Sequence, residues 1–98
     1  MAIDWVLSTD QRTLDIDIHG EFLWRDADAF QAAYSNKLFV ELYRVRIADC
    51  RLLDHSALSM LLTLRDLARA QGARLHIASI SPVCREIFHR ACLDILLT

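Results

Sequence analysis

The sequence predicts an α/β domain with a mixed β-sheet of about five strands and three to four helices packed mainly on one face. Two observations support this: short segments in which apolar and polar residues alternate, and longer intervening segments with apolar residues at helical spacing. The predicted order is ββαβαβαβ, and strands that alternate with helices are typical of a sheet covered by its connecting helices. The 98 residues have the length of one domain, and we expect residues 1–98 to form it.

The first two strands are predicted to pair with each other. In the second of them, apolar residues alternate with polar ones, which predicts a strand with one buried face: Leu14, Asp15, Ile16, Asp17, Ile18 and His19. Residues 3–7 are predicted to form its partner strand, joined to it by a turn near residues 9–11. Gly20 is expected to end the second strand.

A helix and a third strand are predicted next. Asp26 can cap a helix that runs to about Ser35. The apolar residues of this helix recur at helical spacing: Ala27, Phe30, Ala33 and Tyr34. Alternation returns at Tyr43, Val45 and Ile47 and predicts a strand through about Ala48.

The clearest helical pattern follows Asp54 and covers about residues 56–71, with Gly72 as the expected stop. One stripe of this helix is apolar and is predicted to be buried: Ala57, Leu58, Leu61, Leu62, Leu64, Leu67 and Ala68. The opposite face is polar and is predicted to be exposed: Ser59, Thr63, Asp66 and Arg69.

The last third of the chain predicts a strand, a helix and a short final strand. Residues 73–77 read as the fourth strand. Ser81 and Pro82 are a typical helix start, with the serine as cap and the proline in the first turn. In that helix we expect Val83, Ile87 and Ala91 to be buried and residues 92–97 to return as a strand.

Composition excludes several classes of function. The formal net charge is −2 and the arginines are spread along the chain, so the charge pattern of a nucleic-acid-binding protein is absent. The N-terminal residues lack the pattern of a signal peptide, and no apolar run approaches the roughly 20 residues of a membrane span. We therefore expect a cytoplasmic protein that does not insert into membranes.

Neither the cysteines nor the histidines form a pattern typical of metal ligands. The spacings of Cys50, Cys84 and Cys92 fit no zinc site, and we interpret all three as reduced, buried thiols. The four histidines are also scattered along the chain. No metal and no cofactor are expected.

Four stretches of the sequence, in the right order, resemble the STAS domain family. The most specific is Leu53–Leu62 (LDHSALSMLL), which is similar to the D-S-S-G/A-L segment that opens the family's second helix. The others are residues 18–22 (IHGEF), 71–75 (QGARL) and 80–88 (ISPVCREIF). The resemblance covers nearly the whole chain and implies a STAS-like fold.

The resemblance implies a bacterial regulator of the anti-sigma factor antagonist type, which acts by binding another protein and not as an enzyme. Family members of this type bind an anti-sigma factor or serine kinase when unphosphorylated. Phosphorylation of the first serine after the aspartate blocks that binding, and a phosphatase restores it. The implied partner is therefore an anti-sigma factor or a regulator of the serine kinase or phosphatase type, and the implied process is the regulation of transcription.

This chain departs from the family pattern at the position of the phosphorylated serine, which is His55. Ser56 matches the family's second serine and is a possible alternative acceptor. Leu23 and Arg46 stand where relatives often carry acidic or amide residues. A histidine is not a phosphate mimic, so we expect that serine phosphorylation does not switch this protein at residue 55.

The expected docking surface consists of the start of the second helix and the loop after Gly20. A helix N-terminus carries unpaired N–H groups and partial positive charge, which makes it favourable for a phosphate. The expected partner-binding residues are Asp54, His55, Ser56, Ser59, Thr63, Phe22, Leu23 and Trp24. For the three loop residues, packing of two of them in the core is an alternative.

Other functions stay open. Small STAS proteins also serve as subunits of membrane lipid-transport ATPases, and a small-ligand sensor is a third possibility, although no glycine-rich phosphate loop supports it. Asp54, His55 and Ser56 contain the residue types of a hydrolase triad, but consecutive helical residues point in different directions, so no catalytic residue is expected. A homodimer through the apolar loop or an edge strand is also possible.

Overall fold

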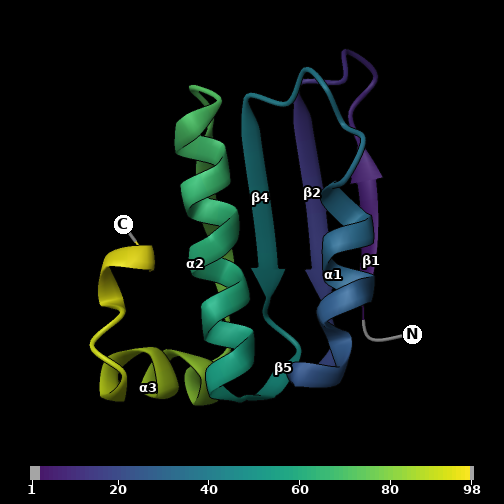
Figure 1. Ribbon diagram of the computed structural model, residues 1–98. Coiled ribbons are helices and arrows are strands. Elements are labelled where there is room, and N and C mark those ends of the chain that lie inside the picture. Colours follow the sequence, from purple (N-terminus) through teal and green to yellow (C-terminus); the bar gives the residue numbers. More distant parts are fainter. Residues whose placement is uncertain (1–2, 98) are drawn as a thin grey trace.

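The computed structural model describes residues 3–97 and contains a four-stranded sheet, a two-stranded sheet and three α-helices (Figure 1). The strands are β1 (Ile3–Leu7), β2 (Thr13–Ile18), β3 (Gly20–Phe22), β4 (Leu42–Ile47), β5 (Cys50–Leu53) and β6 (Arg74–Ile80). The α-helices are α1 (Ala27–Tyr34), α2 (His55–Ala70) and α3 (Pro82–Arg90), and two 3-10 helices are η1 (Trp24–Asp26) and η2 (Asp94–Leu97).

The main sheet has the strand order β1-β2-β4-β6, with β1 antiparallel to β2 and the other pairs parallel. Helices α1 and α2 lie side by side over the same face of this sheet (Figure 1). The alternating apolar residues of β2 and β4 point toward these helices and are buried. The predicted mixed α/β fold is confirmed.

The opposite face of the main sheet carries charged side chains from β2 and β4. Arg44 donates from Nη2 to Oδ2 of Asp15 at 3.0 Å, and Nη2 of Arg46 lies 3.2 Å from Oδ1 of the same aspartate. The hydrogen bond from Arg44 holds the pKa of Asp15 below its usual range. Arg46 therefore belongs to an ion-pair network on this sheet face, where it also lies 3.7 Å from Asp17.

The two-stranded sheet was not predicted, and it places the loop after Gly20 beside the start of α2. Strands β3 and β5 pair in parallel and are only 3 and 4 residues long. They are too short to show a clear alternation of apolar and polar residues. The chain enters β3 at Gly20 with φ of 75°, a conformation that favours glycine. The pairing continues to the end of both strands, where the Asp54 amide donates to the Phe22 carbonyl at 3.4 Å.

Helix α2 forms as predicted, with Asp54 as its N-cap and a left-handed Gly72 after its last turn. Its predicted apolar stripe packs on the sheet, except that Leu67 is exposed. The predicted polar face is exposed, including Ser59 and Thr63. The helix thus buries one side and presents the other to solvent along its whole length.

The C-terminal part of the chain differs from the prediction in two respects. Residues 92–97 do not form a strand; after α3 the chain turns at Cys92, which has φ of 58°, and continues into η2. The buried residues of α3 are Cys84 and Phe88, while Val83 is exposed. The hydroxyl of Ser81, the N-cap of α3, accepts from the Cys84 amide at 3.2 Å and donates to the Cys50 carbonyl at 2.6 Å. These two hydrogen bonds hold the side of α3 that carries Cys84 against β5, which explains why Cys84 is buried and Val83 is not.

The cysteines also differ partly from expectation, because Cys92 is exposed while Cys50 and Cys84 are buried. All three are free thiols. Burial raises the pKa of Cys50 to about 12, so this thiol stays protonated near neutral pH.

Candidate functional site

The start of α2 is tied to the preceding loop by the side chain of Asp54. Its Oδ1 accepts from the Ala57 amide at 2.8 Å, and its Oδ2 accepts from the Trp24 amide at 2.8 Å. Asp26 closes the same loop by accepting from the Leu23 amide at 2.9 Å. Asp26 therefore stabilises η1 and makes no side-chain cap of α1, which differs from its predicted role.

Two backbone amides at this helix start have no acceptor among the described residues. The amides of His55 and Ser56 form no hydrogen bond within residues 3–97, whereas the next two are bonded to Asp54. Unpaired N–H groups at the first turn carry the positive end of the helix dipole. The exposed end of α2 can therefore accept hydrogen bonds or negative charge from another molecule.

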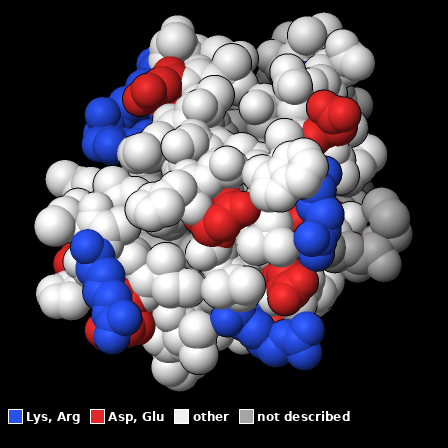
Figure 2. Space-filling model, turned by 60° about the horizontal axis from the view of Figure 1, so that its bottom comes forward, with Lys and Arg blue, Asp and Glu red and all other residues white. Residues whose placement is uncertain are grey.

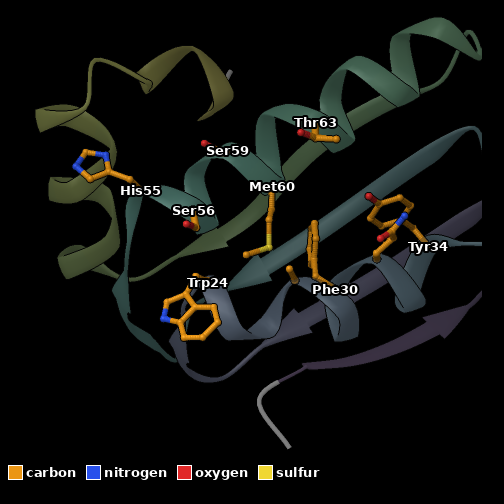
Figure 3. A pocket seen from close by; sticks show the side chains of 10 residues that line it. Trp24, Phe30, Tyr34, His55, Ser56, Ser59, Met60 and Thr63 are labelled. Atoms are coloured by element: carbon orange, nitrogen blue, oxygen red, sulfur yellow. The ribbon is translucent and has the colours of Figure 1, made fainter.

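A groove with a volume of about 500 Å³ lies between α1 and α2 and begins at this helix start (Figure 3). Phe30 and Met60 form its apolar part, and Phe30 is itself buried against Phe22, with ring centroids 5.1 Å apart. The walls consist of residues from the two helices and η1: Trp24, Ala27, Gln31, Tyr34, His55, Ser56, Ser59 and Thr63.

His55 and Ser56 point in different directions from the first turn of α2. In Figure 3 the Ser56 side chain points toward Trp24 and the groove, while the His55 ring lies on the other side, toward α3. His55 also borders a second hollow between α2 and α3, together with Ile87 and Arg90. The hydroxyl that faces the groove is therefore that of Ser56.

The structure brings together most of the predicted docking residues but removes one of them. Asp54 caps α2, and Ser56, Ser59 and Thr63 line the groove from this helix. His55 also borders the hollow between α2 and α3. Phe22 has no exposed surface and belongs to the core, because it faces α1 from the two-stranded sheet. Leu23 is half-buried, and Trp24 is 68% exposed.

The groove residues that sequence reasoning missed come mainly from α1. Gln31 and Tyr34 lie across the groove from α2. The sequence predicted helices on one face of the sheet, but not which residues of α1 face α2. Met60 could have been found, because it lies one turn after Ser56 on the same helix face. We call the half-buried Met60 and the exposed residues around it, Trp24, His55, Ser56, Ser59 and Thr63, the α2 surface.

The surroundings of the α2 surface are largely uncharged. Figure 2 shows the end of the molecule where α2 begins, and the charged side chains there lie in a few separate groups with uncharged side chains between them. Within residues 3–97 no group of three or more potential ligands is placed to hold a metal ion. No helix in this part of the chain is long and apolar enough to cross a membrane.

The arrangement of residues 54–56 does not form a catalytic relay. Asp54 directs its oxygens to the amides of Ala57 and Trp24, so its carboxylate serves as a cap and a loop contact. His55 and Ser56 diverge from each other (Figure 3). The site offers hydrogen-bonding groups and an apolar groove, which suit binding.

Replacing Asp54 by alanine is expected to lower the free energy of unfolding by about 2 kcal/mol, because it removes both the helix cap and the contact to the loop. The measurement is urea denaturation followed by circular dichroism. Asp66→Ala is the matched control, since Asp66 is exposed on the same helix and a surface change there costs at most about 0.5 kcal/mol. Equal losses in the two variants would contradict the role of Asp54.

The fold and this site define a small α/β domain that presents a capped helix start beside a groove. Comparison with known proteins identifies the family. The profile of the family described as "Mlab, STAS domain" matches residues 5–98. A STAS-domain containing protein of Pseudomonas aeruginosa strain UCBPP-PA14 is 38% identical over 88 residues, which are 89% of this chain and 87% of that protein. The chain belongs to the STAS domain family.

Solved structures show the same fold. The unphosphorylated anti-sigma factor antagonist SpoIIAA has a TM-score of 0.85 at 19% identity, covering 99% of this chain and 86% of that one. The phosphorylated form of the Bacillus cell fate determinant SpoIIAA has a TM-score of 0.77 at 19% identity, covering 99% and 89%. An antisigma-factor antagonist STAS domain from Rhodobacter sphaeroides has a TM-score of 0.64 at 19% identity, covering 86% and 87%.

Proposed function

We propose that this protein is a cytoplasmic regulatory binding module of the anti-sigma factor antagonist type, which docks a partner protein through the α2 surface. The proposed partner is an anti-sigma factor or a related serine kinase. The observation that carries the proposal is the exposed start of α2, where two unpaired amides lie at the mouth of a groove with an exposed tryptophan.

The chemistry of the α2 surface suits a protein partner. Aromatic residues are enriched at protein interfaces, because the ring contributes a large apolar contact area. The hydrogen bond from the Trp24 amide to Asp54 holds the backbone of this residue, so the backbone loses little freedom on binding. The groove beside it can receive an apolar side chain of the partner between Phe30 and Met60.

Ser56 is the residue through which we propose that such binding is regulated. Position 55 has no hydroxyl group, and the Ser56 hydroxyl faces the groove (Figure 3). A phosphate there would add nearly two negative charges beside the Asp54 carboxylate, on the surface that the partner would cover. The helix dipole would stabilise that phosphate in the free protein, while docking would have to remove its water shell.

Trp24→Ala is expected to weaken binding of the partner by roughly 30-fold or more, because truncation of an aromatic hot-spot residue costs about 2 kcal/mol or more. The partner is first captured with the tagged protein from cells of the source organism and identified by mass spectrometry. Its affinity for each variant is then measured by biolayer interferometry.

Phe39→Ala is the matched control for this experiment. Phe39 is an aromatic residue with almost the same exposure, 67%, and it lies outside the α2 surface in the loop before β4. Equal weakening by both variants would place the interface elsewhere. Capture of a membrane transporter ATPase instead of an anti-sigma factor or kinase would overturn the proposed partner class and favour the transporter alternative.

A further inference from the structure

A second groove, with a volume of about 290 Å³, lies beside the C-terminal half of α2. Arg65 and Arg69 of α2 and Arg74 of β6 line it, together with the apolar residues Leu75 and Leu96. Leu96 belongs to η2, which packs against β6 and α3. None of these residues lines the groove between α1 and α2, so this is a separate feature of the molecule.

Among residues 3–97, no carboxylate forms an ion pair with any of the three arginines that line this groove. Ion pairs between arginines and carboxylates within residues 3–97 involve other arginines: Arg25, Arg44, Arg46 and Arg90. Asp10 and Glu41 line an adjacent hollow on another side of Arg74, and neither forms an ion pair with it. Three arginine residues thus line one small groove in a chain of net charge −2.

Like charges at one place are unfavourable unless a ligand compensates them. A guanidinium group presents a planar fork of N–H donors that matches two oxygens of one phosphate, and several arginines can share its remaining oxygens. The buried Leu96 and the half-buried Leu75 exclude part of the water, which strengthens such contacts. A carboxylate offers only two oxygens, which suits three forks less well.

We propose that the groove between α2, β6 and η2 binds a phosphate-bearing ligand through Arg65, Arg69 and Arg74. The same chemistry is provided by a soluble phosphorylated metabolite and by the headgroup of an anionic lipid. This site is independent of the α2 surface, so the protein would carry a ligand site in addition to its proposed partner-docking site.

The test for a soluble ligand is titration of the full chain with inorganic pyrophosphate, followed by ¹⁵N NMR. Saturable shifts are expected for residues of the second groove. Arg65→Gln, Arg69→Gln and Arg74→Gln should each weaken binding roughly tenfold, because each removes a charged hydrogen-bond donor. Arg85→Gln is the matched control, since Arg85 is exposed on α3 outside the groove, and it should leave binding unchanged.

The test for a lipid headgroup is flotation with phosphatidylglycerol vesicles, with phosphatidylcholine vesicles for comparison. Flotation that requires the three arginines would assign the site to lipid, and pyrophosphate binding without flotation would assign it to a soluble ligand. Absence of both, or equal loss of binding in Arg85→Gln, would overturn the proposal. Circular dichroism of each variant controls for folding.

Discussion

Replacing Ser56 by aspartate is expected to weaken partner binding roughly 100-fold, which corresponds to about 3 kcal/mol. The new carboxylate would lie at the mouth of the groove between α1 and α2, within the α2 surface and close to Asp54. A partner that covers this place would have to remove water from two neighbouring negative charges. Biolayer interferometry with the captured partner measures the change.

The stability of the Ser56→Asp variant separates lost binding from lost folding. A negative charge in the first turn of a helix is stabilising by about 0.3–1 kcal/mol, so the midpoint of thermal unfolding should stay the same or rise. Ser56→Asn is the matched control, because it has the same size as aspartate but no charge. If Ser56→Asn weakened binding as much as Ser56→Asp, the loss would come from the shape of the side chain. The proposal that negative charge at residue 56 regulates binding would then be wrong.

His55 provides an internal comparison at the neighbouring position. Its ring points toward α3 and away from the groove (Figure 3), so His55→Ala should change binding only modestly. Incubation with a serine kinase from the same organism, followed by mass spectrometry, would show whether Ser56 is an acceptor. A phosphate found on another serine or threonine would move the regulatory site away from the first turn of α2.

The parts of the fold that were predicted correctly are those with long, regular patterns. Strands β2 and β4 alternate because one side faces the helices, and α2 has 16 residues with one apolar stripe and a cap at each end. Such patterns are determined by neighbours in the sequence. The start of α2 as a candidate site followed from the same local signals, the Asp54 cap and the polar face beyond it.

The features that were missed depend on contacts between distant segments. The pairing of β3 with β5 is too short to give a pattern, and yet it carries Trp24 to the start of α2. The predicted final strand is wrong because a run of Ile and Leu in residues 95–97 suits a 3-10 turn with Leu96 buried as well as it suits a strand. The α1 residues that line the groove were not predicted for the same reason. Which residues of two helices face each other depends on how the helices pack in the folded protein.

Phe22 shows how such a long-range contact changes a functional assignment. Together with Leu23 and Trp24 it forms an apolar triplet after Glu21, and the sequence alone does not show which of the three residues pack in the core. In the structure, β3 turns Phe22 inward onto Phe30, while η1 carries Trp24 outward. One residue of the triplet therefore belongs to the core and another to the α2 surface.

Phe22→Ala is accordingly expected to lower the free energy of unfolding by about 3–5 kcal/mol, a large part of the 5–15 kcal/mol typical of a domain. The cause is the cavity left beneath α1 and the loss of the ring contact with Phe30. Urea denaturation followed by tryptophan fluorescence and circular dichroism measures the change.

Trp24→Ala is the counterpart of Phe22→Ala, because it removes a larger side chain two residues away that is mostly exposed. Its free energy of unfolding should change by no more than about 0.5–1 kcal/mol, while partner binding falls. Phe22→Leu keeps most of the buried volume and should recover a large part of the stability lost in Phe22→Ala. If Phe22→Ala left stability intact and weakened only partner binding, the ring would have to be exposed, and the α2 surface would need to be extended to include it.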